Sequence, residues 1–68
     1  MRIGELVRFS PTFYECKNFT KEQAEEQGYK FGVVVEEFQF PDVIRVLVHW
    51  PLRGWATWEV RTNLEGVK

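Results

Sequence analysis

The clearest pattern in the chain is an alternation of apolar and polar residues between positions 43 and 50. Such alternation puts the apolar side chains on one face of an extended chain, so it predicts a strand with one buried face. The apolar face consists of Ile44, Val46, Val48 and Trp50. Residues 31–38, with three consecutive valines, and residues 55–60 predict two further strands, because β-branched and aromatic residues favour extended backbone.

Two more strands are predicted at the ends of the chain. Residues 4–10 alternate in the same way, and residues 64–67 can pair back near this first strand. We expect turns at 40–42 and 51–54, where proline and aspartate or proline and glycine interrupt the pattern. Gly32 in the second strand predicts either a bulge or a close approach of another part of the chain.

The segment 11–30 differs from the rest because it is long and irregular. Proline cannot donate to a ladder, so Pro11 should end the first strand. Thr20 and Gln23 have the spacing of a capping box, which predicts one short helix at about 21–27.

Gly28 is a typical residue to end this helix, because glycine tolerates the left-handed conformation. We expect the insert to cover one opening of the sheet, with Phe19 and Tyr29 packed beneath it. The chain is therefore predicted to be mostly β: one domain spanning 1–68, a five-stranded SH3-like antiparallel barrel with one short helix in its first long loop.

Composition supports a small core built from rings. The 68 residues include three Trp, six Phe and two Tyr, and buried aromatic side chains remove a large area from water. The single cysteine, Cys16, cannot form an internal disulfide, which favours a reducing cytoplasm. We expect no signal peptide, no membrane span and a cytoplasmic location, that of the host if the gene belongs to a phage.

Four short motifs resemble a family of small SH3-like proteins, many from bacteriophages, with a KOW-like or Tudor-like layout. They are Gly4-Glu5-Leu6-Val7-Arg8-Phe9, Gly32-Val33-Val34-Val35-Glu36, Ile44-Arg45-Val46-Leu47-Val48-His49-Trp50 and Trp58-Glu59-Val60-Arg61-Thr62-Asn63-Leu64. The resemblance covers 4–10 and 30–67 and implies the barrel fold. It assigns no functional residue, because such barrels host unrelated functions.

No arrangement of residues predicts catalysis. Cys16 and His49 are the one nucleophile and base worth testing, yet no third polar residue is placed by spacing to orient them. Two ligands are too few for zinc, so we expect no metal, no cofactor and no enzymatic activity.

The main binding candidate is an aromatic and cationic cluster around the turn at 51–54. We expect Trp50 and Trp58 to share the core and Trp55 to be exposed, with the alternative that all three tryptophans close the core. Exposed tryptophan and arginine are enriched where proteins bind partners. The predicted partner-binding residues are Trp55, Arg53, His49 and, from the insert, Tyr14.

Two other functions stay open. Nucleic-acid binding would use Arg8, Arg45, Arg53 and Arg61 on phosphates, with Trp55 stacking on a base. A formal net charge of −1 disfavours it, because nucleic-acid-binding domains usually carry a basic excess. Self-association through open strand edges is the third option.

Overall fold

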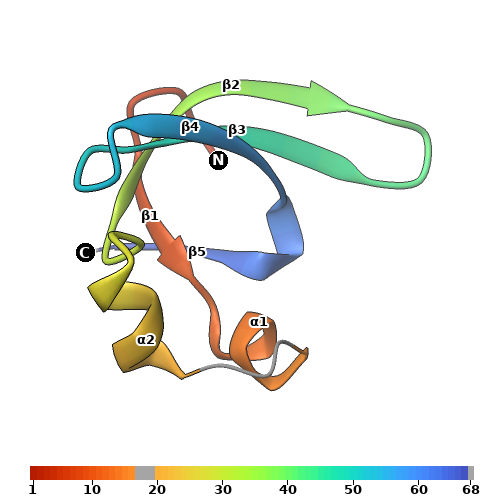
Figure 1. Ribbon diagram of the computed structural model, residues 1–68. Coiled ribbons are helices and arrows are strands. Elements are labelled where there is room, and N and C mark those ends of the chain that lie inside the picture. The colour runs from red at the N-terminus through yellow and green to blue at the C-terminus, as the bar shows by residue number, and fades with distance from the viewer. Residues whose placement is uncertain (17–19, 68) are drawn as a thin grey trace.

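The computed structural model describes residues 1–16 and 20–67. In these two ranges, five strands form one antiparallel sheet with the order β4-β3-β2-β1-β5 (Figure 1). The strands are β1 (Leu6–Phe9), β2 (Gly32–Gln39), β3 (Ile44–Trp50), β4 (Trp55–Val60) and β5 (Leu64–Gly66). Helices α1 (Pro11–Cys16) and α2 (Lys21–Glu26) separate β1 from β2, and a 3-10 turn, Arg61–Asn63, separates β4 from β5.

The predicted architecture of five antiparallel strands is confirmed. The last strand pairs with the first as expected, with Arg8 opposite Glu65 and Phe9 opposite Leu64. Within the described residues β4 and β5 are the outer strands and do not pair with each other, so the sheet is open.

A bulge bends the sheet in the middle of β2. Val34 lies opposite Val48, and Glu36 lies opposite Leu47, so Val35 is an extra residue in the ladder. Bulges increase local twist and bend the strand that carries them. The sheet therefore curls, and the two helices lie on its open side across from β3 and β4 (Figure 1).

The core lies on the inner face of this curled sheet. It includes Val7, Val34, Val46, Val48 and Trp50, whose side chains are fully buried. The Trp50 ring stacks against Phe9, with 4.9 Å between ring centroids. Its indole Nε1–H donates a hydrogen bond to Thr57 Oγ1 at 2.8 Å, so the one polar group of this buried ring is satisfied.

Gly32 allows the side chains of Val48 and Trp50 to approach β2 closely, which was one of its two predicted roles. A Cβ atom at this position would lie 2.3 Å from Val48 Cγ1 and 2.9 Å from Trp50 Cε3. Any side chain at position 32 would therefore clash with Val48 and Trp50, so the close approach requires glycine.

The prediction that Trp58 belongs to the core is wrong. The β3–β4 register places Trp50 opposite Trp55 and Leu47 opposite Trp58. Trp58 consequently shares the outer face with Leu47, and its side chain is 47% exposed. Strand side chains alternate between faces, so this register alone sends Trp58 outward.

The insert contains a helix that the sequence analysis did not predict. Pro11 ends β1 and also begins α1, a position that suits proline because the first helical N–H has no partner in the helix. Phe13 from this helix stacks on Phe9, with ring centroids 3.8 Å apart and an interplanar angle of 10°.

The one helix that was predicted, at about 21–27, is confirmed as α2, which ends one residue earlier, at Glu26. Thr20 and Gln23 form both hydrogen bonds of the capping box. The helix ends in a Schellman arrangement, in which the N–H of Tyr29 bonds the carbonyl of Ala24 and Gly28 has a φ of +91°. Tyr29 packs on the core as expected, whereas Phe19 lies outside the described residues.

Neither described helix has the length or the apolar run that crossing a bilayer would require.

Candidate functional site

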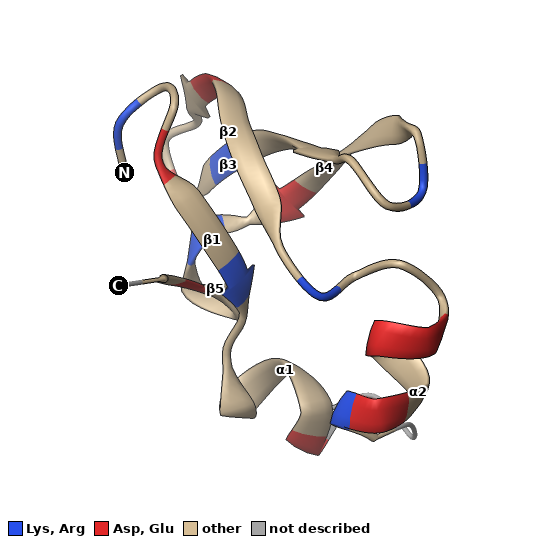
Figure 2. Cartoon of the chain, turned by 90° about the vertical axis from the view of Figure 1, so that its left-hand side faces the viewer, with Lys and Arg blue, Asp and Glu red and all other residues tan. Residues whose placement is uncertain are grey.

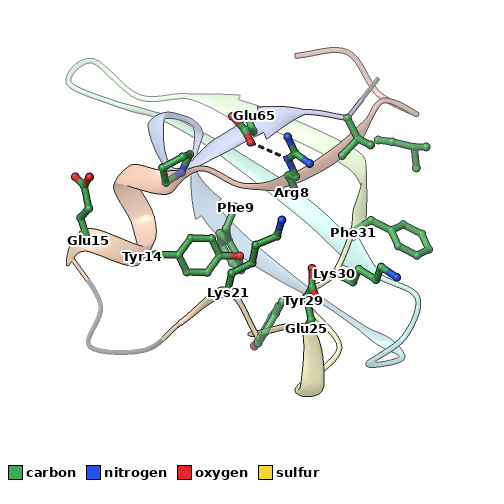
Figure 3. A pocket seen from close by; sticks show the side chains of 13 residues that line it. Arg8, Phe9, Tyr14, Glu15, Lys21, Glu25, Tyr29, Lys30, Phe31 and Glu65 are labelled. Carbon is green, nitrogen blue, oxygen red and sulfur yellow. Dashed lines mark hydrogen bonds and ion pairs between the residues drawn. The ribbon is translucent and has the colours of Figure 1, made fainter. Parts of the chain in front are cut away.

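A groove lies between the β1–β5 edge of the sheet and the two helices. It has a volume of about 840 Å³, and most of its surface is apolar. Figure 3 shows it with β1 and β5 on one side and α1 and α2 on the other. Its apolar walls consist of Leu6, Phe9, Pro11, Tyr14, Tyr29, Phe31 and Val67.

Strand β1 supplies one wall because of its alternation. Val7 and Phe9 are buried in the core, so Leu6 and Arg8 point to the other side of the strand. Leu6 is 45% exposed there. Opposite Arg8 in the ladder, Glu65 of β5 accepts its Nε–H at 2.7 Å, and this ion pair forms the upper rim in Figure 3.

Helix α1 positions Tyr14 in the opposite wall. Its ring meets Phe9 edge-on at 6.4 Å between centroids and Phe13 edge-on at 5.5 Å, and Figure 3 shows the hydroxyl pointing toward the middle of the groove. Burial and, to a smaller extent, the Glu25 carboxylate raise the pKa of Tyr14 above its ordinary value. The raised pKa favours the neutral phenol.

The rim of the groove carries balanced charge. It combines three cations, Arg8, Lys21 and Lys30, with three carboxylates, Glu15, Glu25 and Glu65. Charges of both signs are also interspersed in the view of Figure 2. Such a rim does not create the one-sided positive field that phosphate binding requires.

Tyr29 connects the groove to the turn between β3 and β4. The guanidinium of Arg53 lies 4.6 Å from the centroid of the Tyr29 ring and 4.6 Å from that of the Trp55 ring. Arg53 also donates a hydrogen bond to the carbonyl oxygen of Gln27. The arginine is thus held between two rings and ties the turn to the end of α2.

Gly28 makes room for this contact. A Cβ atom there would lie 2.5 Å from Arg53 Cγ and 3.1 Å from the Arg53 backbone nitrogen. The glycine that ends α2 therefore also lets the turn pack against the helix.

The four predicted partner-binding residues fall into three places. Arg53 and Trp55 lie together, and Trp55 is 55% exposed as predicted. Tyr14 lies in the groove. His49 pairs with Ala56 and Val33 and is therefore on the outer face of the sheet, away from Trp55.

The arginines of the nucleic-acid hypothesis are dispersed. Arg8 is paired with Glu65, and Arg53 is held by Tyr29, Trp55 and Gln27. Arg45 lies on the outer face near Phe40, opposite Val60, and Arg61 follows Val60 in the 3-10 turn. Arg8 and Arg53 are thus already engaged by other side chains, and only Arg45 and Arg61 are neighbours in the ladder.

The Cys16 side chain lies outside the described part of the structure, so its relation to His49 is not defined. Among the side chains that the structure describes, no group of three or more His, Cys, Asp and Glu residues is arranged to hold a metal ion.

Of the residues that line the groove, only Tyr14 and Arg8 were predicted as site residues; Leu6, Tyr29 and Phe31 are among those that were missed. Leu6 has a detectable signal, because it is an apolar residue out of phase with the buried pair Val7 and Phe9. Tyr29 and Phe31 have none, since their position depends on how the insert folds back onto β1.

Comparisons with models of protein families, with curated proteins and with solved structures each found no match to this chain.

Proposed function

We propose that the protein is a non-enzymatic interaction module that binds a segment of another protein in the groove between β1, β5 and the helices. The observation that carries the proposal is the groove itself, a hollow of about 840 Å³ with a mainly apolar lining. A volume of this size lies within the range of roughly 300–1,000 Å³ that is typical of ligand sites.

The walls favour a peptide with apolar side chains and little net charge. Leu6, Tyr14 and Phe31 offer apolar and aromatic contact, which is the kind of surface that anchors partner side chains. The balanced rim gives no preference for a strongly acidic or strongly basic segment.

The exposed ring of Trp55 extends this surface. Arg53 covers one side of that ring, and Tyr29 joins Arg53 to the groove. A partner that leaves the groove past Tyr29 would therefore meet Trp55 next. His49 is not part of this proposed surface.

The proposal includes the origin and type of the fold. Five short antiparallel strands with a long first loop support an SH3-like barrel with an opening between β4 and β5. The proposed phage origin rests on the resemblance of the four sequence motifs alone.

Selection of peptides tests the function directly. A random peptide library displayed on phage is panned against the purified protein, and the dissociation constant of an enriched peptide is measured by calorimetry. Leu6→Glu should weaken binding by about tenfold or more, because it buries a charge against the apolar wall on binding.

Leu52→Glu is the matched control. Leu52 is 59% exposed but lies in the β3–β4 turn, outside the groove. Its binding should stay within about twofold of wild type, a difference of under 0.5 kcal/mol. Failure to enrich any peptide, or equal losses in both leucine variants, contradicts the proposal.

Self-association is a second candidate because both outer strands, β4 and β5, have an unpaired edge in the described structure. Light scattering after size exclusion, at a series of protein concentrations, tests it. A mass that rises with concentration supports this candidate, whereas a constant monomer mass excludes it.

A further inference from the structure

Glu59 is a carboxylate on the core-facing side of the outer strand β4. In the ladder it lies opposite Val46, whose side chain is fully buried. Its Oε2 accepts a hydrogen bond from Thr57 Oγ1 at 2.7 Å, and Thr57 Oγ1 in turn accepts the Trp50 Nε1–H at 2.8 Å. This chain of hydrogen bonds orients the carboxylate from the core outward.

Glu59 borders a second cleft, separate from the groove. The cleft has a volume of about 460 Å³ and lies between β4 and the helices. Its lining includes four aromatic residues, Phe9, Phe13, Tyr29 and Trp58, and the polar residues Gln27 and Asn63. A negative group and the negative faces of aromatic rings therefore meet in one hollow.

Among the described side chains, no lysine or arginine forms an ion pair with Glu59. The ion pairs found there join the amino terminus to Glu37 and Arg8 to Glu65. Arg45 and its ladder partner Val60 also border the cleft, and the guanidinium carbon of Arg45 lies 6.0 Å from the Phe40 ring centroid.

We propose that this cleft receives a lysine or arginine side chain of a partner protein. The charged end would bind the Glu59 carboxylate, and the aliphatic stem would lie along the rings of Phe13 and Tyr29. Charge-assisted hydrogen bonds are stronger than neutral ones, and aromatic faces attract cations. The molecule already holds a cation in this way, because Arg53 lies between two rings with a hydrogen bond to a carbonyl oxygen.

The position of the cleft explains how a partner would reach it. β4 has one neighbour, β3, and its other edge is unpaired within the described residues. An extended segment along that edge would direct every second side chain to the inner face, beside Thr57 and Glu59. The proposal does not depend on the groove, which shares only Phe9 and Tyr29 with the lining of this cleft.

The test uses three blocked peptides, Ac-Ala-Lys-Ala-NH2, Ac-Ala-Arg-Ala-NH2 and Ac-Ala-norleucine-Ala-NH2. Each is titrated into the ¹⁵N-labelled protein, with the indole N–H signal of Trp50 as the reporter because that group is linked to Glu59 through Thr57. The lysine and arginine peptides should shift this signal saturably. The norleucine peptide, which lacks the charge, should bind about tenfold more weakly or not at all.

Glu59→Gln should weaken the binding of the lysine peptide about tenfold, which is the loss expected for one charged hydrogen bond. Glu36→Gln is the matched control, since it removes the same charge from the exposed part of β2 and should leave binding unchanged. Leu6→Glu should also leave it unchanged, which separates this cleft from the groove. Equal binding of lysine and norleucine peptides to the wild type, or unaltered binding by a folded Glu59→Gln, overturns the proposal. If Glu59→Gln does not fold, the proposal is tested by the difference in binding of the lysine and norleucine peptides to the wild-type protein.

Discussion

Both the core around Trp50 and the groove beside β1 are built from aromatic and aliphatic side chains, but these are buried in the core and exposed in the groove. Trp50 is fully buried between the sheet and two rings, Phe9 at 4.9 Å and Tyr29 at 5.1 Å between centroids. In the groove, by contrast, Leu6 is 45% exposed and faces a hollow. Aromatic and aliphatic side chains thus stabilise the fold where the sheet encloses them and leave a binding surface where it does not.

Two rings belong to both regions. Phe9 and Tyr29 contact Trp50 on one side and line the groove on the other. A wall anchored in the core moves little, so less entropy is lost when a partner binds.

The largest effect is expected from Trp50→Ala. Removing a fully buried tryptophan typically costs about 3–5 kcal/mol, and a domain of this size has little more stability than that. The variant should be largely unfolded in urea titrations followed by circular dichroism. Trp58→Ala, on the outer face, should cost about 1 kcal/mol or less. Similar losses at both tryptophans would contradict the assigned register.

A smaller loss is expected at the junction between the regions. Gly28→Ala should destabilise the protein by about 2 kcal/mol, because it combines a positive φ with a clash against the Arg53 side chain. Gly54→Ala is the control: its φ is +85°, but nothing lies near the added Cβ, so about 1 kcal/mol is expected. Thermal unfolding measures both, and equal losses would mean that the Arg53 contact at Gly28 is unimportant.

The contact between Arg53 and Trp55 should contribute less to the free energy of unfolding than the packing at Gly28 does. A double-mutant cycle with Arg53→Met and Trp55→Ala should give a coupling free energy of about 0.5–1 kcal/mol, the usual value for a partly exposed cation–ring pair. Additive losses would show that the two side chains are adjacent without stabilising each other.

The smallest effect concerns pH. The pKa of Tyr14 is raised in the folded protein, mainly by burial, so the unfolded chain loses this proton first as the pH rises. The resulting stability is complete below the ordinary tyrosine pKa of about 10 and is lost as the pH rises toward the folded value. Unfolding free energies measured across this alkaline range should fall less steeply for Tyr14→Phe. Parallel curves for the two proteins would contradict the assignment.

The sheet was predictable because its signals are local. Alternation located the strands, and the capping box located α2. The face of Trp58 was not predictable, since it depends on which residue of β4 opposes Trp50, and a shift of one residue reverses every side chain. Helix α1 was missed because Pro11 was interpreted only as the end of a strand, although proline also begins helices.

The candidate site was harder to predict than the fold. Tyr14, Arg53 and Trp55 could be selected by residue type, and the last two do lie together. The groove, however, arises where the insert packs across β1, and Tyr29 and Phe31 enter it through contacts between segments distant in sequence. Nothing in the sequence around Glu59 distinguishes it from other strand residues. It became a candidate because the fold places it in one cleft with aromatic rings from distant segments.

The most direct test of the account is an amide chemical-shift map of the wild-type protein with a peptide enriched by the display selection. The account predicts that the largest changes occur at Leu6, Tyr14 and Tyr29, with smaller changes at Trp55. Changes centred instead on the outer face of the sheet, around Trp58, would contradict the assignment of the groove as the partner-binding surface.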